Sequence, residues 1–128
     1  MLVMFIRRLT LPPRPFLLLG PRGTGKTTWL RRHLPRAQWY NLLLDRELLR
    51  LMREPGAFRR EIEALPKGAW VVIDEVQKLP SLLNEVHDAL TAEPKRWNFA
   101  LSGSSARRLR RAEVNLLGGR VVMRQMLP

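Results

Sequence analysis

The chain of 128 residues has room for one domain with a hydrophobic core, and not for two. It contains no cysteine, which excludes a disulfide framework and a thiolate metal site. The formal net charge is +12, and no apolar run in the sequence is long enough to span a membrane. The apolar residues at the start have no basic region before them and do not resemble a signal peptide, so we expect a cytoplasmic protein without a membrane partner.

The hydrophobic pattern predicts alternating strands and helices. The expected strands cover residues 16–19, 38–44, 69–73, 97–101 and 121–123. The expected helices cover residues 26–34, 45–53, a segment after Pro55-Gly56 that runs to Leu65, a segment from Leu79 to about Pro94, and a short basic stretch after Ser104. Asp45 is expected to cap its helix. Repeated strand–helix–strand units indicate an α/β fold, with a mostly parallel sheet covered on both faces.

The first expected strand leads directly into a glycine-rich octet. Residues 20–27 fit the pattern G-x-x-x-x-G-K-[ST] without a mismatch. Its three glycines permit positive φ, so that successive N–H groups can point into one concavity and bind phosphate. Lys26 is expected to reach the β- and γ-phosphates of ATP, and the hydroxyl of Thr27 is expected to bind Mg²⁺. The candidate cofactor-binding residues are Gly20, Pro21, Arg22, Gly23, Thr24, Gly25, Lys26, Thr27 and Thr28.

A second motif is an apolar strand that ends in two carboxylates, Asp74 and Glu75. Ligands of open α/β sheets lie beyond the carboxyl ends of the strands, where the glycine-rich octet would also be found. Asp74 is therefore expected to hold Mg²⁺, as a Walker-B aspartate does. Glu75 is expected to follow in the pleat, point toward the γ-phosphate and polarise a water molecule as the catalytic base.

A third signal is the run of small polar residues that follows the expected strand 97–101. A hydroxyl at this edge could contact the γ-phosphate or the attacking water from the neighbouring strand. Ser102 is the first candidate for this catalytic role and Ser104 is the second. The alternative interpretation is that Ser104 or Ser105 only caps the next helix.

Arginine accounts for most of the positive charge, and two interpretations of it stay open. Pairs at helical spacing, Arg50–Glu54 and Arg59–Glu63, favour solvated helix faces. An uncompensated cluster favours contact with nucleic acid. This cluster consists of Arg107, Arg108, Arg110 and Arg111.

The order of these elements is that of the P-loop ATPases with an additional strand and a catalytic glutamate, a three-layer fold with a five-stranded parallel sheet in the order 5-1-4-3-2. Five segments also resemble one known group. They are Gly-Pro-Arg-x-x-Gly-Lys-Thr-Thr from Gly20, Tyr40-Asn41-Leu42, Ile73-Asp74-Glu75-Val76-Gln77-Lys78, Leu101-Ser102-Gly103-Ser104-Ser105-Ala106, and Gly118-Gly119-Arg120. Together they are similar to the AAA+-type core of a family of predicted prokaryotic ATPases, in which a C-terminal domain of uncharacterised function follows the core.

The resemblance implies binding and hydrolysis of ATP with Mg²⁺, giving ADP. The residues it implicates are Lys26, Thr27, Asp74, Glu75, a polar sensor at Ser102, and Gln77. Residues 1–128 are expected to form the core domain alone, without the helical lid or the C-terminal domain. AAA+-type sites commonly need a neighbouring subunit, so a homo-oligomer is one expectation, with Arg120 as a candidate arginine finger offered in trans. Otherwise Arg120 is a surface charge beside a turn.

Two other functions compete with ATP hydrolysis. One is a nucleotide-binding module without efficient turnover. The other is a small-molecule or nucleotide kinase, because kinases also use a phosphate loop. The adjacent carboxylates Asp74 and Glu75, and the polar residues after strand 97–101, favour water as the acceptor over a substrate hydroxyl.

Overall fold

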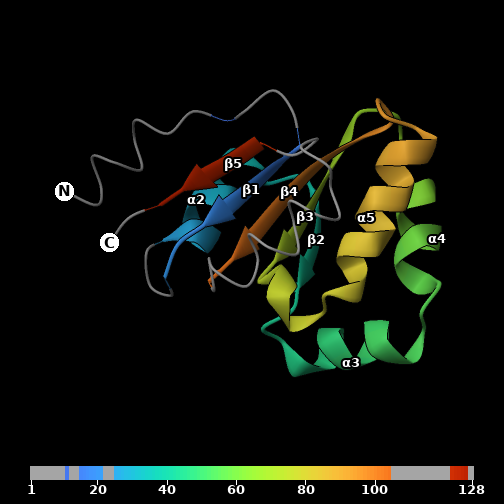
Figure 1. The fold of residues 1–128 in the computed structure, drawn as a ribbon, viewed down its shortest axis with the longest axis horizontal. Coiled ribbons are helices and arrows are strands. Elements are labelled where there is room, and N and C mark those ends of the chain that lie inside the picture. The colour runs from blue at the N-terminus through green and yellow to red at the C-terminus, as the bar shows by residue number, and fades with distance from the viewer. Residues whose placement is uncertain (1–10, 12–14, 22–24, 105–121, 127–128) are drawn as a thin grey trace.

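Five strands, all of them parallel, form a single sheet with helices on both sides (Figure 1). The computed structural model describes residues 11, 15–21, 25–104 and 122–126. The elements are β1 Phe16–Leu19, α2 Lys26–His33, β2 Gln38–Asn41, α3 Asp45–Arg53, α4 Ala57–Glu63, β3 Ala69–Asp74, the 3₁₀ turn η1 Val76–Lys78, α5 Ser81–Ala92, β4 Trp97–Gly103 and β5 Val122–Gln125.

The strands lie in the order β2-β3-β4-β1-β5. This is the expected order 5-1-4-3-2 counted from the other edge, so the predicted α/β fold is confirmed. The register places Leu19 of β1 beside Gly103 of β4, and Asn41 of β2 beside Asp74 of β3. The carboxyl ends of β1, β3 and β4 therefore lie next to one another, as a ligand site at that edge requires.

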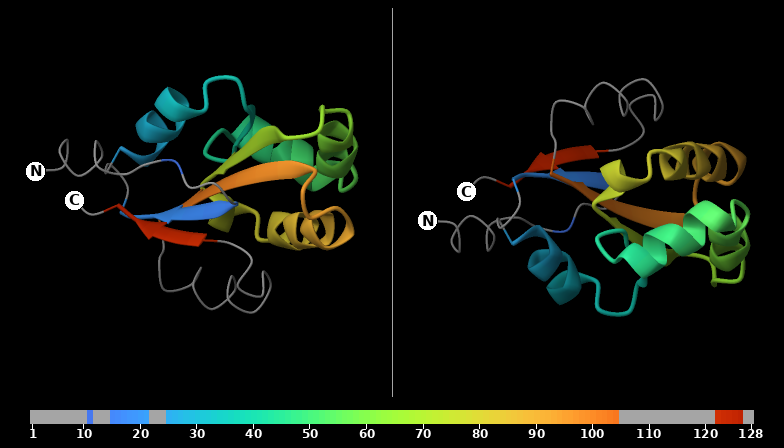
Figure 2. Two further views of the ribbon diagram at one scale, coloured as in Figure 1. Left: turned by 90° about the horizontal axis from the view of Figure 1, so that it is seen from above. Right: turned by 90° about the horizontal axis from the view of Figure 1, so that it is seen from below.

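Alternate residues of the strands belong to two separate hydrophobic clusters, one on each face of the sheet. Leu18, Val72 and Ala100 pack with Trp29 and Leu30 of α2 on one face. The opposite face packs against α4, α5 and part of α3. Its cluster includes Leu17, Ile73, Leu101, Leu51, Phe58, Ile62, Leu82, Leu83, Val86 and Leu90. Figure 2 shows α2 and α5 on opposite sides of the sheet. Continuous apolar runs such as that of β1 are explained by burial on both faces.

The connection from β2 to α3 differs from the expectation in two ways. The strand ends at Asn41 instead of Leu44, because the Asn41 carbonyl accepts a hydrogen bond from the Leu44 N–H at 3.2 Å and turns the chain. Asp45 is not the cap. Leu44 occupies the cap position without a side-chain hydrogen bond, and Asp45 stands in the first turn, where its negative charge favours the helix dipole.

One of the two predicted arginine pairs is also wrong. Arg59 and Glu63 do pair, with Nε and Oε1 at 2.7 Å. Arg50, however, bonds Glu47 at 2.9 Å and Glu61 at 2.6 Å instead of Glu54. Glu61 belongs to α4, so it is a tertiary partner that helical spacing cannot reveal.

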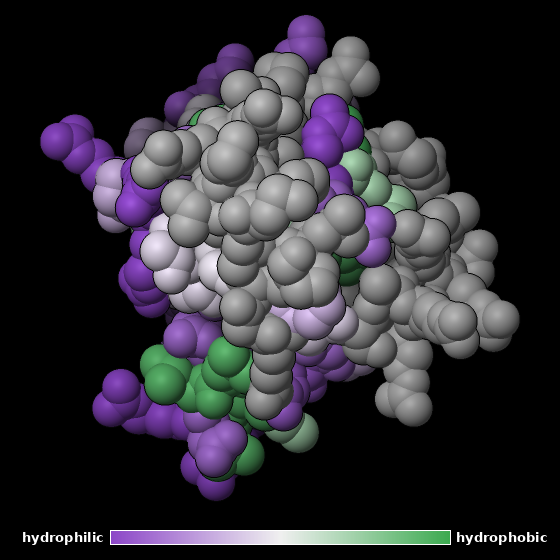
Figure 3. Space-filling model, turned by 90° about the vertical axis from the view of Figure 1, so that its left-hand side faces the viewer, coloured by the Kyte–Doolittle hydropathy of each residue, from purple (hydrophilic) through white to green (hydrophobic). Residues whose placement is uncertain are grey.

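Large apolar side chains are exposed on α3 and on the connection that precedes it. They are Leu43, Leu44, Leu49 and Met52. Figure 3 shows an apolar patch low on the molecule, at the height of α3, with hydrophilic residues around it. Among the described helices, none is both long and apolar enough to cross a membrane.

Candidate functional site

The site forms where β1, β3 and β4 end. The N–H of Gly20 donates to the carbonyl of Gly103 at 3.2 Å, so the chain stays alongside β4 as it leaves β1. Ile73 lies opposite Leu101 in the register of β3 and β4. These pairings bring the start of the octet, the carboxylates after Ile73 and the serines after Leu101 to one edge of the sheet.

The described part of the octet supports only some of the expected glycine geometry. Gly25 has φ 86° and is the residue from which α2 begins. Its carbonyl accepts the first helical hydrogen bond, from Trp29 at 2.9 Å. Gly20 does not have the positive φ that we expected, because it is buried and continues the strand pairing. Pro21 and Thr28 are exposed, whereas Arg22, Gly23 and Thr24 lie outside the described residues.

Lys26 is a buried cation surrounded by oxygen atoms, and only 5% of the residue is exposed. Its Nζ donates to the carbonyl of Gly20, to that of Pro21 at 3.4 Å and to Ser104 Oγ at 3.2 Å. It also lies 3.5 Å from Oε1 of Glu75. Lys26 therefore connects the octet to the residues that directly follow β3 and β4.

Two hydroxyl groups share the carboxylate of Asp74, which is fully buried. Thr27 Oγ1 donates to Oδ2 at 2.8 Å, and Ser102 Oγ donates to Oδ1 at 2.5 Å. The described residues hold no cluster of three or more His, Cys, Asp or Glu side chains that could bind a metal alone. Mg²⁺ in nucleotide sites needs few protein ligands, because phosphates and water fill its other positions. The adjacent oxygens of Thr27 and Asp74 fit that requirement.

Glu75 departs from the pleat in which we expected it to continue. It has φ 62°, a left-handed backbone that costs a residue other than glycine about 1–3 kcal/mol. Its N–H donates to Ser102 Oγ at 2.9 Å. Its carboxylate accepts hydrogen bonds from Ser104 at 2.5 and 2.6 Å and from Gln77 Nε2 at 2.8 Å.

These contacts determine the charge of Glu75. Burial raises the pKa of the carboxyl group, but the hydrogen bonds from Ser104 and Gln77 and the charge of Lys26 together outweigh it. The pKa of Glu75 is therefore lowered, and the group is ionised at neutral pH. An ionised carboxylate can accept a proton.

The two candidate serines are engaged in different contacts. Ser102 is fully buried behind Asp74, where it donates to the carboxylate and accepts the Glu75 N–H. Ser104, our second candidate, contacts both Lys26 and Glu75. The contact of Gln77 with Glu75 had no signal in the residue pattern beyond the family resemblance, since a polar residue three positions after a strand is common.

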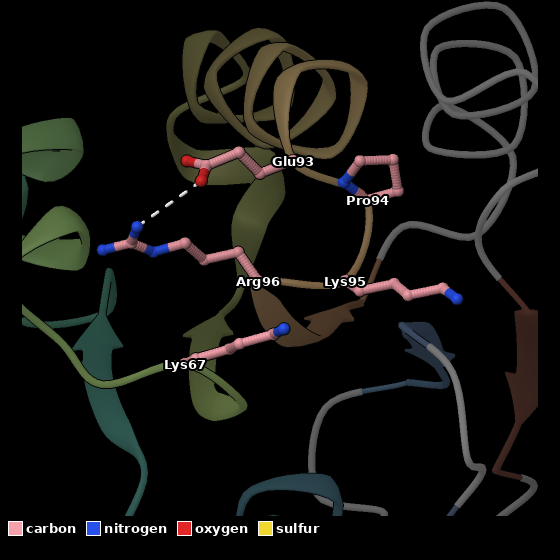
Figure 4. Close-up of a pocket in the computed structure, with 5 residues that line it drawn as sticks. All are labelled: Lys67, Glu93, Pro94, Lys95 and Arg96. Atoms are coloured by element: carbon pink, nitrogen blue, oxygen red, sulfur yellow. Dashed lines mark hydrogen bonds and ion pairs between the residues drawn. The ribbon is translucent and has the colours of Figure 1, made fainter.

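A hollow of about 420 Å³ lies at the amino ends of the strands, opposite the end that carries this site. Its lining residues precede β3 and β4 and are Lys67, Glu93, Pro94, Lys95 and Arg96 (Figure 4). Glu93 and Arg96 form an ion pair there with atoms 3.4 Å apart. Because this hollow is at the amino ends of the strands, its residues cannot contact a ligand of the glycine-rich octet.

The fold and the site together define a P-loop nucleotide-binding domain. A parallel sheet of this order carries the octet after β1 and an acidic pair after β3. A family model described as an AAA domain matches residues 12–128, and the chain belongs to this family. Membership supports an AAA-type ATPase core that binds nucleotide. Among curated proteins, none matches the chain at a significant level.

Proposed function

We propose that the chain binds Mg-ATP and hydrolyses it to ADP and phosphate. The observation that carries the proposal is the meeting of Lys26, Glu75 and Ser104 beside the Thr27–Asp74 pair. A phosphate-binding cation, a carboxylate able to accept a proton and a hydroxyl–carboxylate pair suited to Mg²⁺ are the groups that this reaction needs.

Phosphate binding relies on Lys26 and on the backbone of the loop. The carbonyls of Gly20 and Pro21 and the Oγ of Ser104 are uncharged oxygen atoms, so a β,γ-phosphate group is a stronger partner for the Lys26 ammonium. The N-terminus of α2, which begins at Lys26, adds favourable electrostatic interaction with an anion. Nucleotide binding would then replace some of the acceptors at Nζ.

Thr27 and Asp74 would hold the metal ion. When bound, Mg²⁺ neutralises charge on the phosphates. Ser102 fixes the Asp74 carboxylate from the side opposite Thr27 and keeps one of its oxygens aimed at the phosphate loop. Ser102 therefore acts as a positioning residue.

Glu75 is the proposed base. The attacking water forms a bond to the γ-phosphorus as the bond from that phosphorus to the bridging oxygen breaks. The bonding electrons leave with ADP, and a water proton moves to the carboxylate of Glu75. Ser104, which touches both Lys26 and Glu75, is better placed than Ser102 to sense the γ-phosphate.

The test compares phosphate release by the parent chain and by Glu75→Gln. The variant keeps the size and polarity of the side chain but loses the charge, so ATP should still bind while hydrolysis falls by about 10²–10⁴-fold. Equal hydrolysis by both would refute the assignment of the base. Binding without turnover in the parent would support the nucleotide-binding module. Phosphate transfer to an added acceptor in place of release would support a kinase.

We also propose that residues 1–128 act as one ATPase domain, the core of the prokaryotic family whose larger members carry a C-terminal domain. The motifs shared with that family support this assignment. Completion of the site by a neighbouring copy, and a cytoplasmic location, are parts of the same proposal. Arg120 and the arginine cluster at 107–111 lie outside the described residues, so their roles as finger and nucleic-acid contact rest on the sequence.

A further inference from the structure

Among the described residues, the side-chain amide of Gln77 is hydrogen-bonded through its nitrogen only, and its oxygen is buried. Nε2 donates to Glu75 Oε2 at 2.8 Å. Oε1 is buried and, in the part of the chain that the structure describes, accepts no hydrogen bond. A buried acceptor without a partner is costly, because it has lost its hydrogen bonds to water, and such atoms are uncommon enough to need an explanation.

The chemistry of the neighbouring groups fixes which way the amide faces. Nε2 is the donor of the amide and it faces the Glu75 carboxylate, which leaves Oε1 as the free acceptor. The backbone at this point is also held, because the Lys78 N–H donates to the Glu75 carbonyl at 3.0 Å and Val76 is fully buried. The free oxygen of Gln77 is thus kept close to the proposed base.

Three other buried side-chain atoms lack a partner among the described residues, and none of them adjoins a carboxylate of the site. They are Trp29 Nε1, His87 Nδ1 and Arg96 Nε. Gln77 differs from these three residues. Its free atom, Oε1, is an acceptor in the same amide group as Nε2, which binds Glu75. A water molecule that enters the site beside the Glu75 carboxylate would find a free acceptor in Gln77 Oε1.

We propose that Gln77 is a further catalytic residue, whose Oε1 accepts a hydrogen bond from the attacking water. This inference rests on the proposed ATP hydrolysis. One proton of the water is held by Gln77 while the other moves to Glu75, and the oxygen lone pair left free attacks the γ-phosphorus. Gln77 neither gains nor loses a proton, so the balance of the reaction is unchanged. Its contribution is to orient the water before the bond forms.

The test uses two phosphate mimics with ADP and Mg²⁺. ADP with aluminium fluoride mimics the planar transition state with its in-line water, whereas ADP with beryllium fluoride mimics the ground state of ATP. Gln77→Leu and Gln77→Met should bind the aluminium fluoride complex at least about tenfold more weakly than the parent, because that complex includes the oriented water. Affinity for the beryllium fluoride complex should change less than twofold, which also shows that the variants are folded.

A double-mutant cycle separates direct contact with water from an effect through Glu75. If Oε1 holds the water, Gln77→Leu should weaken the aluminium fluoride complex in the Glu75→Gln background as well. No further loss in that background would mean that Gln77 only positions Glu75 and would overturn the inference. An equal loss for both mimics, or none for either, would overturn it too. A parent chain that binds neither mimic would overturn the proposed function, and the inference with it.

Discussion

Lys26 and Glu75 form an ion pair with Nζ and Oε1 3.5 Å apart, and each side chain is only 4% exposed. Removal of either partner leaves a buried charge without its counterion. The cation proposed to bind phosphate and the carboxylate proposed to accept a proton therefore interact electrostatically with each other. A change at one of them is expected to alter the other.

Lys26→Ala should therefore weaken ATP binding and also lower the free energy of unfolding. We expect affinity to fall at least about tenfold, which corresponds to about 1.4 kcal/mol. Titration with a fluorescent ATP analogue measures the first effect and urea denaturation the second. Lys95→Ala is the matched control, since Lys95 is exposed at the amino end of β4, away from the site. Unchanged affinity in Lys26→Ala would refute the phosphate-loop assignment.

Ser102→Ala and Ser104→Ala should differ in phenotype. Ser102→Ala removes a donor from buried Asp74 and an acceptor from the Glu75 N–H, so we expect a loss of stability of about 1–3 kcal/mol. Ser104 is partly exposed, and its loss should mainly reduce turnover because Glu75 loses a hydrogen-bond donor. Denaturation curves and phosphate-release rates on the same two preparations check this. The reverse pattern would assign the sensor role to Ser102.

Acid stability should depend on Glu61. The hydrogen bonds from Arg50 lower the pKa of this carboxyl group, outweighing its partial burial, and Tyr40 donates a further bond at 2.9 Å. A carboxyl group with a lowered pKa in the folded state stabilises the protein above its unfolded pKa of about 4.5, and this stabilisation is lost as the pH falls through the folded value. Glu61→Gln should therefore flatten the pH dependence of the unfolding free energy below about pH 4.5. A parallel curve for the variant would contradict this.

The proposal of sites shared between subunits predicts a particular dependence on protein concentration. If a neighbouring copy supplies Arg120, turnover should rise more than proportionally with protein concentration, because an arginine supplied in trans can accelerate phosphoryl transfer by about 10³–10⁵-fold. Arg120→Ala should abolish that rise and leave nucleotide affinity intact. Rates strictly proportional to concentration, and insensitive to Arg120, would show that each chain works alone.

Contact with nucleic acid by the arginine cluster at 107–111 would appear as a steep loss of affinity with salt, since each phosphate contact releases counterions. Changing Arg107, Arg108, Arg110 and Arg111 together to Gln should flatten that slope in a filter-binding or anisotropy titration. Absence of binding at low salt would leave the solvated-surface interpretation.

The fold was predictable because its signals are local. The apolar run of β1, the octet that follows it and the apolar period of α5 each specify one element, and the alternation of elements specifies a parallel sheet. The contacts of the site were less predictable. The left-handed Glu75 is held by a hydrogen bond from its N–H to Ser102 of β4, and Arg50 pairs with Glu61 of α4 as well as with Glu47 of its own helix. Ser102 and Glu61 are distant in the sequence from the residues they bind, so local patterns could not indicate these two contacts.

The position of β1 in the sheet has a consequence for the order in which the protein assembles. This early strand pairs on one side with β4 and on the other with β5, both of which come late in the chain. During synthesis on the ribosome, β2 and β3 can pair with each other well before either neighbour of β1 has emerged. Such distant pairings form slowly, because a long loop must close before any contact compensates for its entropy. The strand that leads into the phosphate loop is therefore expected to be incorporated late, and a nascent chain that already contains the octet cannot yet recognise nucleotide.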